Sequence, residues 1–299
     1  MLLFALALIA GGPTVRSIIV APAESIAVTV VGHGEPVVLI PGLMGSAFAF
    51  RRVAPQLVDA GFEVVIVEPL GIGGSARPRA ADYSLTAQAA RVAAALDTLG
   101  LHDAVIVAHS IGGSIAFRLA FHRPDLVAGI VSVEGGPAAE ATTSGFRFAM
   151  RFAKLLRLGG SGLLRHTVDH EMKAASGDST WVTDAVVTGY TAGAARDFTA
   201  TLTAFQGMAA SHEPPEPLST ELSRVRCPVV LLVGLAPHSS GVPPTEVALL
   251  RDSLPAFTVD SIPGVGHFIF EENLATVVDA VTRLRRSVPA VARGGAAQR

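Results

Sequence analysis

Ser110 is the residue whose type and surroundings point most directly to chemistry. It lies in Ala-His-Ser-Ile-Gly-Gly, residues 108–113, where a buried Val/Ile run gives way to an Ala- and Leu-rich stretch. This is the setting of a nucleophile elbow, in which small residues such as Ala108 and Gly112 let the neighbouring strand and helix approach. Ala108 stands where the pattern G-x-S-x-G has glycine, a difference of one methyl group. The segment predicts a nucleophilic serine that attacks an ester-like carbonyl carbon.

Such an attack places negative charge on the carbonyl oxygen, which two backbone N–H groups can stabilise. One N–H should belong to Ile111, which follows the nucleophile at the positive end of a helix. The other should come from Pro-Gly-Leu-Met-Gly, residues 41–45, a loop that follows an apolar run. Leu43 is the first choice there and Met44 the second. We therefore predict an oxyanion hole formed by Leu43 and Ile111.

The hydrophobic pattern shows the elements that must position these groups. From residue 26 onward, short Val- and Ile-rich runs alternate with longer Ala- and Leu-rich stretches. This alternation predicts an α/β fold, with helices on both faces of a mostly parallel sheet. The expected strands are residues 26–31, 37–40, 64–68, 104–108, 130–134, 229–233 and 257–262. The expected helices are residues 50–60, 85–99, 112–122 and 274–285.

These motifs together resemble the α/β-hydrolase superfamily, especially its capped esterase, lipase and dehalogenase-like branches. The family often has His-Gly-x where residues 41–43 read Pro-Gly-Leu. Residues 68–75 are similar to its D-x-x-G-x-G-x-S turn, with Glu68 in place of Asp. The resemblance covers roughly residues 26–286. It implies an α/β-hydrolase fold and serine hydrolysis that uses neither a metal nor an organic cofactor.

The resemblance also implies a histidine base in the loop after the last strand. His267 occupies that place in Pro-Gly-Val-Gly-His-Phe, residues 263–268. A neutral imidazole can accept the proton of Ser110 and later return it to the leaving group. His109 is a poorer candidate because it adjoins Ser110 on the turn and should point elsewhere.

The triad acid does not lie where this family usually has it. The common pattern after the strand 229–233 is G-x-x-D, whereas residues 234–237 read Gly-Leu-Ala-Pro and the next carboxylate is Glu246. Some dehalogenase-like relatives carry their acid at the end of the strand that follows the elbow helix, the place of Glu134. Neighbouring parallel strands end at the same edge of a sheet, where ligands gather. We therefore predict Glu134 as the acid, with Glu246 and Asp260 as alternatives.

A helical insertion, defined here as residues 138–218, interrupts the strand pattern and divides the hydrolase core into residues 24–137 and 219–286. It ends near the prolines of residues 211–215, which stop a helix. Its aromatic, Leu and Met side chains predict an apolar inner face, part of which should line a pocket. The predicted pocket residues, including two from core loops, are Met44, Phe148, Phe152, Trp181, Phe205, Met208 and Phe268.

Two other patterns have simpler interpretations than a ligand site. His166 and His170 share a helix face with Asp169, but there is no H-E-x-x-H order and no evident third ligand, so we expect a polar face and no metal. The glycines of residues 71–74 lack the Lys-Ser/Thr of a phosphate loop and predict a tight turn.

Composition limits the classes of partner. The chain has 299 residues, of which 50% are hydrophobic and 16% charged, enough for one large core. Its formal net charge of -2 gives no support for nucleic-acid binding, and a small-molecule ester is the expected partner. Cys227 is the only cysteine, so no intrachain disulfide can form. The composition does not indicate an oligomeric state.

The two ends of the chain carry their own patterns. Residues 2–10 are apolar, but too few to span a bilayer. Residues 1–23 could form a signal peptide with Ala-Pro-Ala at 21–23 as the cleavage site, although no Lys or Arg precedes the apolar run. Export and a cytoplasmic location both remain open. Residues 287–299 are rich in Ala, Gly and Arg and predict a loose tail.

The leading functional hypothesis is a carboxylic ester hydrolase that favours apolar acyl or alcohol groups. A lactonase, a C–C bond hydrolase or a perhydrolase would use the same residues, because the insertion sets substrate choice. A low-turnover binding protein is a further alternative, motivated by the missing G-x-x-D acid. Haloalkane dehalogenase and epoxide hydrolase chemistry is disfavoured, since those branches use an Asp nucleophile where this chain has Ser110.

Overall fold

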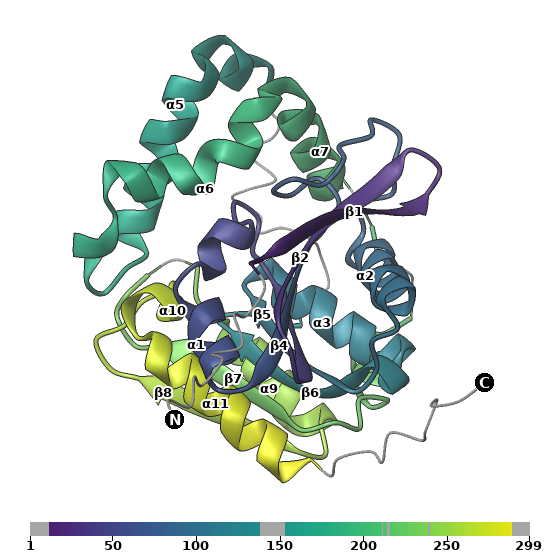
Figure 1. The fold of residues 1–299 in the computed structure, drawn as a ribbon. Helices are drawn as coiled ribbons and strands as arrows, with labels where there is room; N and C mark the ends of the chain where they lie inside the picture. Colours follow the sequence, from purple (N-terminus) through teal and green to yellow (C-terminus); the bar gives the residue numbers. More distant parts are fainter. Residues whose placement is uncertain (1–11, 138–152, 211, 214–215, 239, 289–299) are drawn as a thin grey trace, which may run out of the picture.

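The computed structural model describes residues 12–137, 153–210, 212–213, 216–238 and 240–288. Phe148 and Phe152, two of the predicted pocket residues, lie outside the described residues. Within the described part, eight strands form one sheet in the order β1-β2-β4-β3-β5-β6-β7-β8 (Figure 1). The strands are β1 (Thr14–Ala21), β2 (Glu24–Gly32), β3 (Glu35–Ile40), β4 (Phe62–Glu68), β5 (Ala104–His109), β6 (Val127–Val133), β7 (Val229–Gly234) and β8 (Phe257–Ile262).

β2 pairs antiparallel with both of its neighbours, β1 and β4. The strands β4, β3, β5, β6, β7 and β8 are all parallel to one another. The central strands are buried along their whole length, as continuous Val and Ile runs predict for a sheet covered on both faces. The predicted α/β fold class is therefore confirmed. Because β3, β5, β6, β7 and β8 run in the same direction, the loops that follow them leave from one edge of the sheet.

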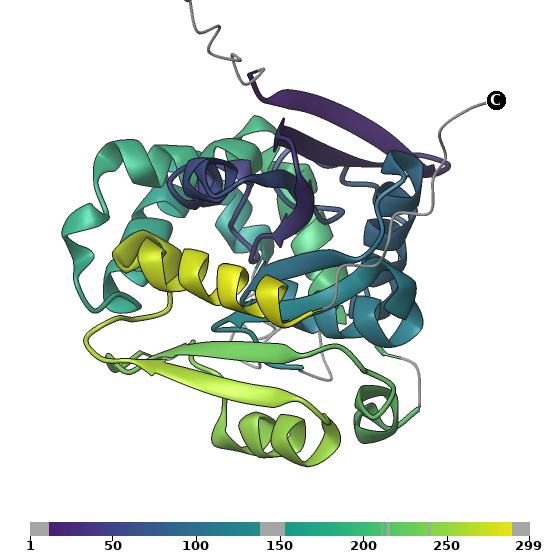
Figure 2. The ribbon, with the colours of Figure 1, turned by 60° about the horizontal axis from the view of Figure 1, so that its bottom comes forward.

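Helices cover both faces of this sheet. The helical elements are η1 (Ala47–Phe50), α1 (Val53–Asp59), α2 (Leu85–Leu99), α3 (Ile111–His122), η2 (Pro124–Leu126), α5 (Ala153–Ala174), η3 (Ser179–Trp181), α6 (Asp184–Arg196), α7 (Phe198–Ala210), α8 (Leu218–Leu222), α9 (Pro244–Ser253), α10 (Ile269–Glu272) and α11 (Leu274–Ser287). Side chains of α2, α3, α8 and α9 share a core with one face, and those of α1, α10 and α11 share a core with the other. Figure 2 shows α11 and α9 on opposite sides of β7 and β8. Among the helices that the structure describes, none combines the length and hydrophobicity that a membrane crossing requires.

Two elements differ from the sequence-based expectation. The strand β1 was not predicted, because its residues lie within the segment 1–23 that the sequence analysis interprets as a possible signal peptide. It forms the edge of the sheet and leaves Val15 72% and Ile19 79% accessible. Of residues 21–23, the predicted cleavage site, Ala21 ends β1 and the other two form the turn to β2, where Ala23 has a positive φ of 61°. The helix expected over residues 50–60 is divided into η1 and α1.

The helices α5, α6 and α7 follow β6 in the chain and lie together beyond η1 (Figure 1). Gly189 of α6 permits close contact with η1, because a Cβ at this position would lie 2.2 Å from the Phe48 ring. The neighbouring Tyr190 donates a hydrogen bond of 2.8 Å to the buried carboxylate of Glu271, which also pairs with Arg51 at 2.5 Å. This network ties the insertion to α10, two residues after the predicted base.

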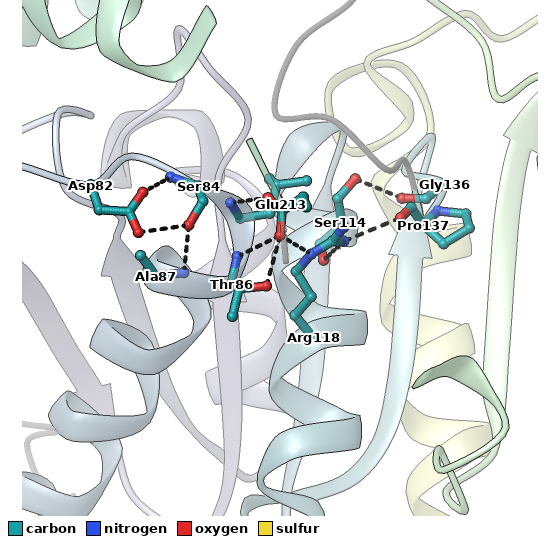
Figure 3. A network of polar contacts seen from close by, with 10 residues as sticks. Asp82, Ser84, Thr86, Ala87, Ser114, Arg118, Gly136, Pro137 and Glu213 are labelled. Atoms are coloured by element: carbon teal, nitrogen blue, oxygen red, sulfur yellow. Dashed lines mark hydrogen bonds and ion pairs between the residues drawn. The ribbon is translucent and has the colours of Figure 1, made fainter. Parts of the chain in front are cut away.

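Both ends of the insertion meet at a second polar network, drawn in Figure 3. The Arg118 guanidinium, 1% exposed, donates to the carbonyl of Pro137 at 3.2 Å and to the Glu213 carboxylate at 3.1 Å. Glu213 also accepts the backbone N–H groups of Leu85 and Thr86, which begin α2. A carboxylate at a helix N-terminus satisfies free N–H groups there and opposes the positive end of the helix dipole.

Replacing Glu213 with alanine is expected to lower the free energy of unfolding by about 3 kcal/mol, because it leaves the buried Arg118 charge without its carboxylate. The measurement is urea unfolding at neutral pH. Glu216→Ala is the matched control, since Glu216 pairs with Arg224 at 2.5 Å on the surface. The control substitution should lower the free energy of unfolding by less than about 1 kcal/mol. Equal losses in the two variants would contradict the role assigned to the Glu213 network.

Candidate active site

Ser110 occupies the sharp turn between β5 and α3. It is the N-cap residue of α3 and has φ 53° and ψ −124°, a backbone conformation that L-residues rarely adopt. Its N–H donates to the carbonyl of Val133 at 3.0 Å, which fixes the turn against the end of β6. Gly112 is required for close approach, because a Cβ there would lie 2.6 Å from the Ile40 carbonyl oxygen. The strain and the tight packing are the features expected of a nucleophile elbow.

The loop after β3 lies directly against Ser110. A Cβ on Gly42 would be 3.1 Å from the Cβ of Ser110. Gly45 N–H closes a turn by donating to the Gly42 carbonyl at 2.9 Å, which makes Leu43 one of its two central residues. Ile111 is the first residue of α3. The structure thus brings the loop of Leu43 to the elbow of Ile111, and the oxyanion hole itself stays a prediction.

Glu68 holds this loop in place. The buried carboxylate accepts the N–H of Ala47 at 2.6 Å and the N–H of Gly74 at 2.5 Å. It therefore joins the segment after the loop of residues 41–45 to the glycine-rich turn of residues 71–74. Sequence reasoning noted Glu68 only as a departure from the family's Asp, and it missed this positioning role.

His267 is held by contacts to its backbone. Its N–H donates to the Ala175 carbonyl at 2.7 Å, just beyond the end of α5. His109 Nε2 lies 3.2 Å from the His267 carbonyl oxygen, to which it must donate because a carbonyl only accepts. Burial and the neighbouring His267 hold the pKa of His109 well below its ordinary value. His109 is therefore a neutral group that donates a hydrogen bond to the His267 backbone.

Glu134 follows β6 directly and turns its carboxylate toward His267. It has a positive φ of 50° and is 2% exposed. One carboxylate oxygen, Oε1, accepts the Gly234 N–H at 2.5 Å. The other, Oε2, lies 3.9 Å from His267 Nδ1. That separation exceeds a hydrogen bond, and contacts between catalytic groups often shorten only when substrate is bound.

The two alternative acids lie in other surroundings. Asp260 pairs with Arg283 at 2.6 Å on an exposed part of the sheet edge. Glu246 of α9 lies against the backbone of Gly136, where an added Cβ would be 1.9 Å from its Oε2. Glu134 is the predicted acid that the structure places beside His267 Nδ1.

His238 is a residue of this site that sequence reasoning missed. Its Nε2 lies 3.7 Å from Glu134 Oε2, and its side chain is 3% exposed. Burial lowers the pKa of His238, an effect that the neighbouring Glu134 opposes. The available signal was its position directly after the Gly-Leu-Ala-Pro loop of residues 234–237, where the family pattern usually has the acid.

The predicted pocket residues fall into separate groups. Met44 and Phe205 line a small cavity together with Leu43. Trp181 and Phe268 contact each other at a ring-centroid distance of 5.3 Å, and Phe268 lies 5.3 Å from the His267 ring. Met208 is buried and packs against Gly71, where a Cβ would lie 2.9 Å from its Cε. Their contact with a substrate stays a prediction.

Comparisons with known proteins agree with this architecture. The family described as alpha/beta hydrolase fold matches residues 35–274. The chain is 27% identical over 262 residues to the sn-1-specific diacylglycerol lipase ABHD11 of Mus musculus. The matched segment covers 82% of this chain and 79% of that protein. The solved structure of Cfl2 from Burkholderia cenocepacia has a TM-score of 0.74 at 23% identity and covers 91% of this chain and 95% of its own.

Other curated relatives match over shorter segments. An uncharacterized protein of Mycobacterium bovis, Mb2734, is 32% identical over 120 residues, which is 40% of this chain and only 35% of that protein. Epoxide hydrolase A of Mycobacterium tuberculosis is 32% identical over 145 residues, 46% of this chain and 44% of the relative. These similarities support hydrolase activity without specifying the bond that is cleaved. With the family matched over most of its length, the chain belongs to the α/β-hydrolase fold family.

Proposed function

We propose that this chain is a serine hydrolase that cleaves carboxylic esters through an acyl-enzyme formed on Ser110. The observation that carries the proposal is the strained Ser110 at the start of α3, with φ 53° and ψ −124°. Support comes from His267 and Glu134, whose facing atoms lie 3.9 Å apart at the same edge of the sheet. Histidine and carboxylate are the two groups that such a serine needs for activation.

The reaction follows from the roles of these groups. Ser110 Oγ attacks the ester carbonyl carbon while His267 Nε2 takes the Oγ proton. The charge on the carbonyl oxygen is stabilised by the N–H groups of Leu43 and Ile111. His267 then gives the proton to the departing alcohol, and the same base activates the water that releases the acid. Glu134 keeps the His267 proton on Nδ1 and stabilises the imidazolium that forms in between.

The serine nucleophile separates this proposal from the activity named for some relatives. Epoxide hydrolase A is similar to 46% of this chain, but the resemblance implies an Asp nucleophile for that chemistry. Ser110 occupies the elbow here, and a serine alkoxide suits an acyl carbonyl. A lactonase, C–C bond hydrolase or perhydrolase would use the same groups and remains an alternative within the serine class.

Substrate preference should follow the apolar residues around the site. Phe268 packs beside His267 and Trp181 packs against Phe268, and we propose that residues 138–218 act as a cap over the acyl or alcohol group. In a series of p-nitrophenyl esters from acetate to octanoate, kcat/KM is expected to rise by up to about fourfold for each buried methylene. The hemisuccinate ester serves as a charged comparison. Equal rates across the series, or a preference for the charged ester, would contradict an apolar pocket.

A low-turnover binding protein is the second candidate function. The observation that favours it is the 3.9 Å separation between Glu134 and His267, which is too long for a hydrogen bond in this structure. In that case Ser110 would not react with serine-directed reagents. Labelling with a fluorophosphonate measures this difference.

A further inference from the structure

Three side chains at the carboxyl edge of the sheet converge on one point. Glu134 follows β6, His238 follows β7 and His267 follows β8. Glu134 Oε2 lies 3.7 Å from His238 Nε2 and 3.9 Å from His267 Nδ1. Ligand atoms from all three residues lie within 4.8 Å of one another. The triad explains two members of this cluster but gives no role to His238.

The cluster also contains buried polar atoms that have no hydrogen-bond partner among the residues that the structure describes. These atoms are Glu134 Oε2, His238 Nδ1 and His267 Nδ1. Leaving such atoms unpaired away from water costs about 1–3 kcal/mol each. His267 faces Glu134 Oε2 with its unpaired Nδ1, and His238 faces the same oxygen with its other nitrogen, Nε2. Neither nitrogen is close enough to the carboxylate for a normal hydrogen bond. Two imidazole nitrogens and one carboxylate oxygen thus converge, as the ligands of a metal ion do.

We propose that Glu134, His238 and His267 form a binding site for a divalent cation of the zinc type, and that the bound ion switches the hydrolase off. Two nitrogen ligands and one oxygen ligand match Zn²⁺, with water as the fourth ligand. Tetrahedral ligands about 2.1 Å from zinc are about 3.4 Å apart, so the two separations to Glu134 Oε2 need to close only slightly. Mg²⁺ and Ca²⁺ prefer six or more oxygen ligands, which this cluster does not offer.

The inhibitory effect follows from the position of one proton and rests on the proposed function. As a base, His267 carries its proton on Nδ1 and leaves the Nε2 lone pair for the Ser110 proton. Zinc at Nδ1 needs the lone pair of that nitrogen, so the proton of the neutral ring moves to Nε2 through solvent. Nε2 can then only donate, and Glu134 is occupied by the ion. Zinc binding and proton transfer from Ser110 therefore exclude each other.

Direct binding of zinc tests the site without any reference to activity. The full chain, treated with EDTA and dialysed, is titrated with ZnCl₂ in a calorimeter, and about one ion per chain is expected. His238→Gln should weaken binding by more than about tenfold, since it removes one ligand. His102→Gln is the matched control on an exposed turn, and it should bind zinc as the unmodified chain does. CaCl₂ should give no binding heat.

The rate of ester cleavage by each variant, compared with its own zinc-free rate, tests whether zinc binding inhibits the enzyme. Zinc should inhibit the unmodified chain and His102→Gln, EDTA should restore the rate, and His238→Gln should need more than about tenfold more zinc. Absence of zinc binding, or equal binding by His238→Gln, would overturn the site. Binding without inhibition of an active enzyme would overturn the switch. Zinc binding at His238 in a chain that cleaves no ester would support the site and count against the proposed function instead.

Discussion

Replacing Ser110 with alanine is expected to lower kcat for ester cleavage by about ten-thousandfold or more. Ser110 supplies the oxygen that forms the acyl-enzyme, and no neighbouring side chain can replace it on the turn between β5 and α3. The fold should persist, because the backbone contacts of Ser110 to Val133 and Gly113 do not use its hydroxyl. Initial rates on p-nitrophenyl butyrate, with circular dichroism to verify folding, provide the measurement.

Ser219→Ala is the matched control for this variant. Ser219 lies exposed on α8, away from the carboxyl edge of the sheet, so the same chemical change there should leave the rate intact. Full activity in a folded Ser110→Ala variant would show that another group carries the reaction. It would remove the basis for the acyl-serine mechanism.

Replacing Glu134 with glutamine is expected to reduce kcat by about 100- to 10,000-fold with little change in KM. The amide keeps nearly the same shape, and its oxygen can still accept the Gly234 N–H that Glu134 accepts at 2.5 Å. The change removes the charge that stabilises the His267 imidazolium and the acceptor that keeps its proton on Nδ1. KM should stay nearly constant because Glu134 acts through His267 and not on the substrate.

Two further carboxylates provide controls for Glu134. Asp260→Asn breaks a surface ion pair with Arg283, and Glu246→Gln changes a carboxylate beside Gly136. Both were considered as the acid on sequence grounds, and both variants should keep kcat within about threefold, the range of small effects at sites away from the reacting groups. A loss in Asp260→Asn or Glu246→Gln equal to that of Glu134→Gln would reassign the acid.

Much of the fold could be predicted from the sequence because buried parallel strands have a strong signature. The Val- and Ile-rich runs located β2 to β8, and the confirmed fold places the carboxyl ends of the parallel strands β3 to β8 at one edge. The strand β1 also contains Val and Ile, but its residues fall in the segment 1–23 that was interpreted as a possible signal peptide. The break between η1 and α1 was not visible either, because helical periodicity continues through Arg51 and Arg52.

The candidate site was predictable to the extent that motifs mark chain positions. The elbow and the final loop identified Ser110 and His267, and strand order led to Glu134. His238 was missed because spacing along the chain does not show which side chains from different loops turn toward one point. The role of His109 was equally hidden, since its hydrogen bond to His267 joins residues 158 positions apart. Such contacts are determined by tertiary packing.

The most direct test of the central claim is covalent labelling of Ser110 by a fluorophosphonate. The full chain is incubated with the probe, and peptide mass spectrometry locates and quantifies the adduct. The proposed mechanism predicts rapid labelling at Ser110, no adduct at this position in Ser110→Ala, and a rate at least about 100-fold lower in His267→Ala. An inert Ser110 in the folded protein, or labelling that is unchanged by loss of His267, would contradict the assignment of an activated serine nucleophile.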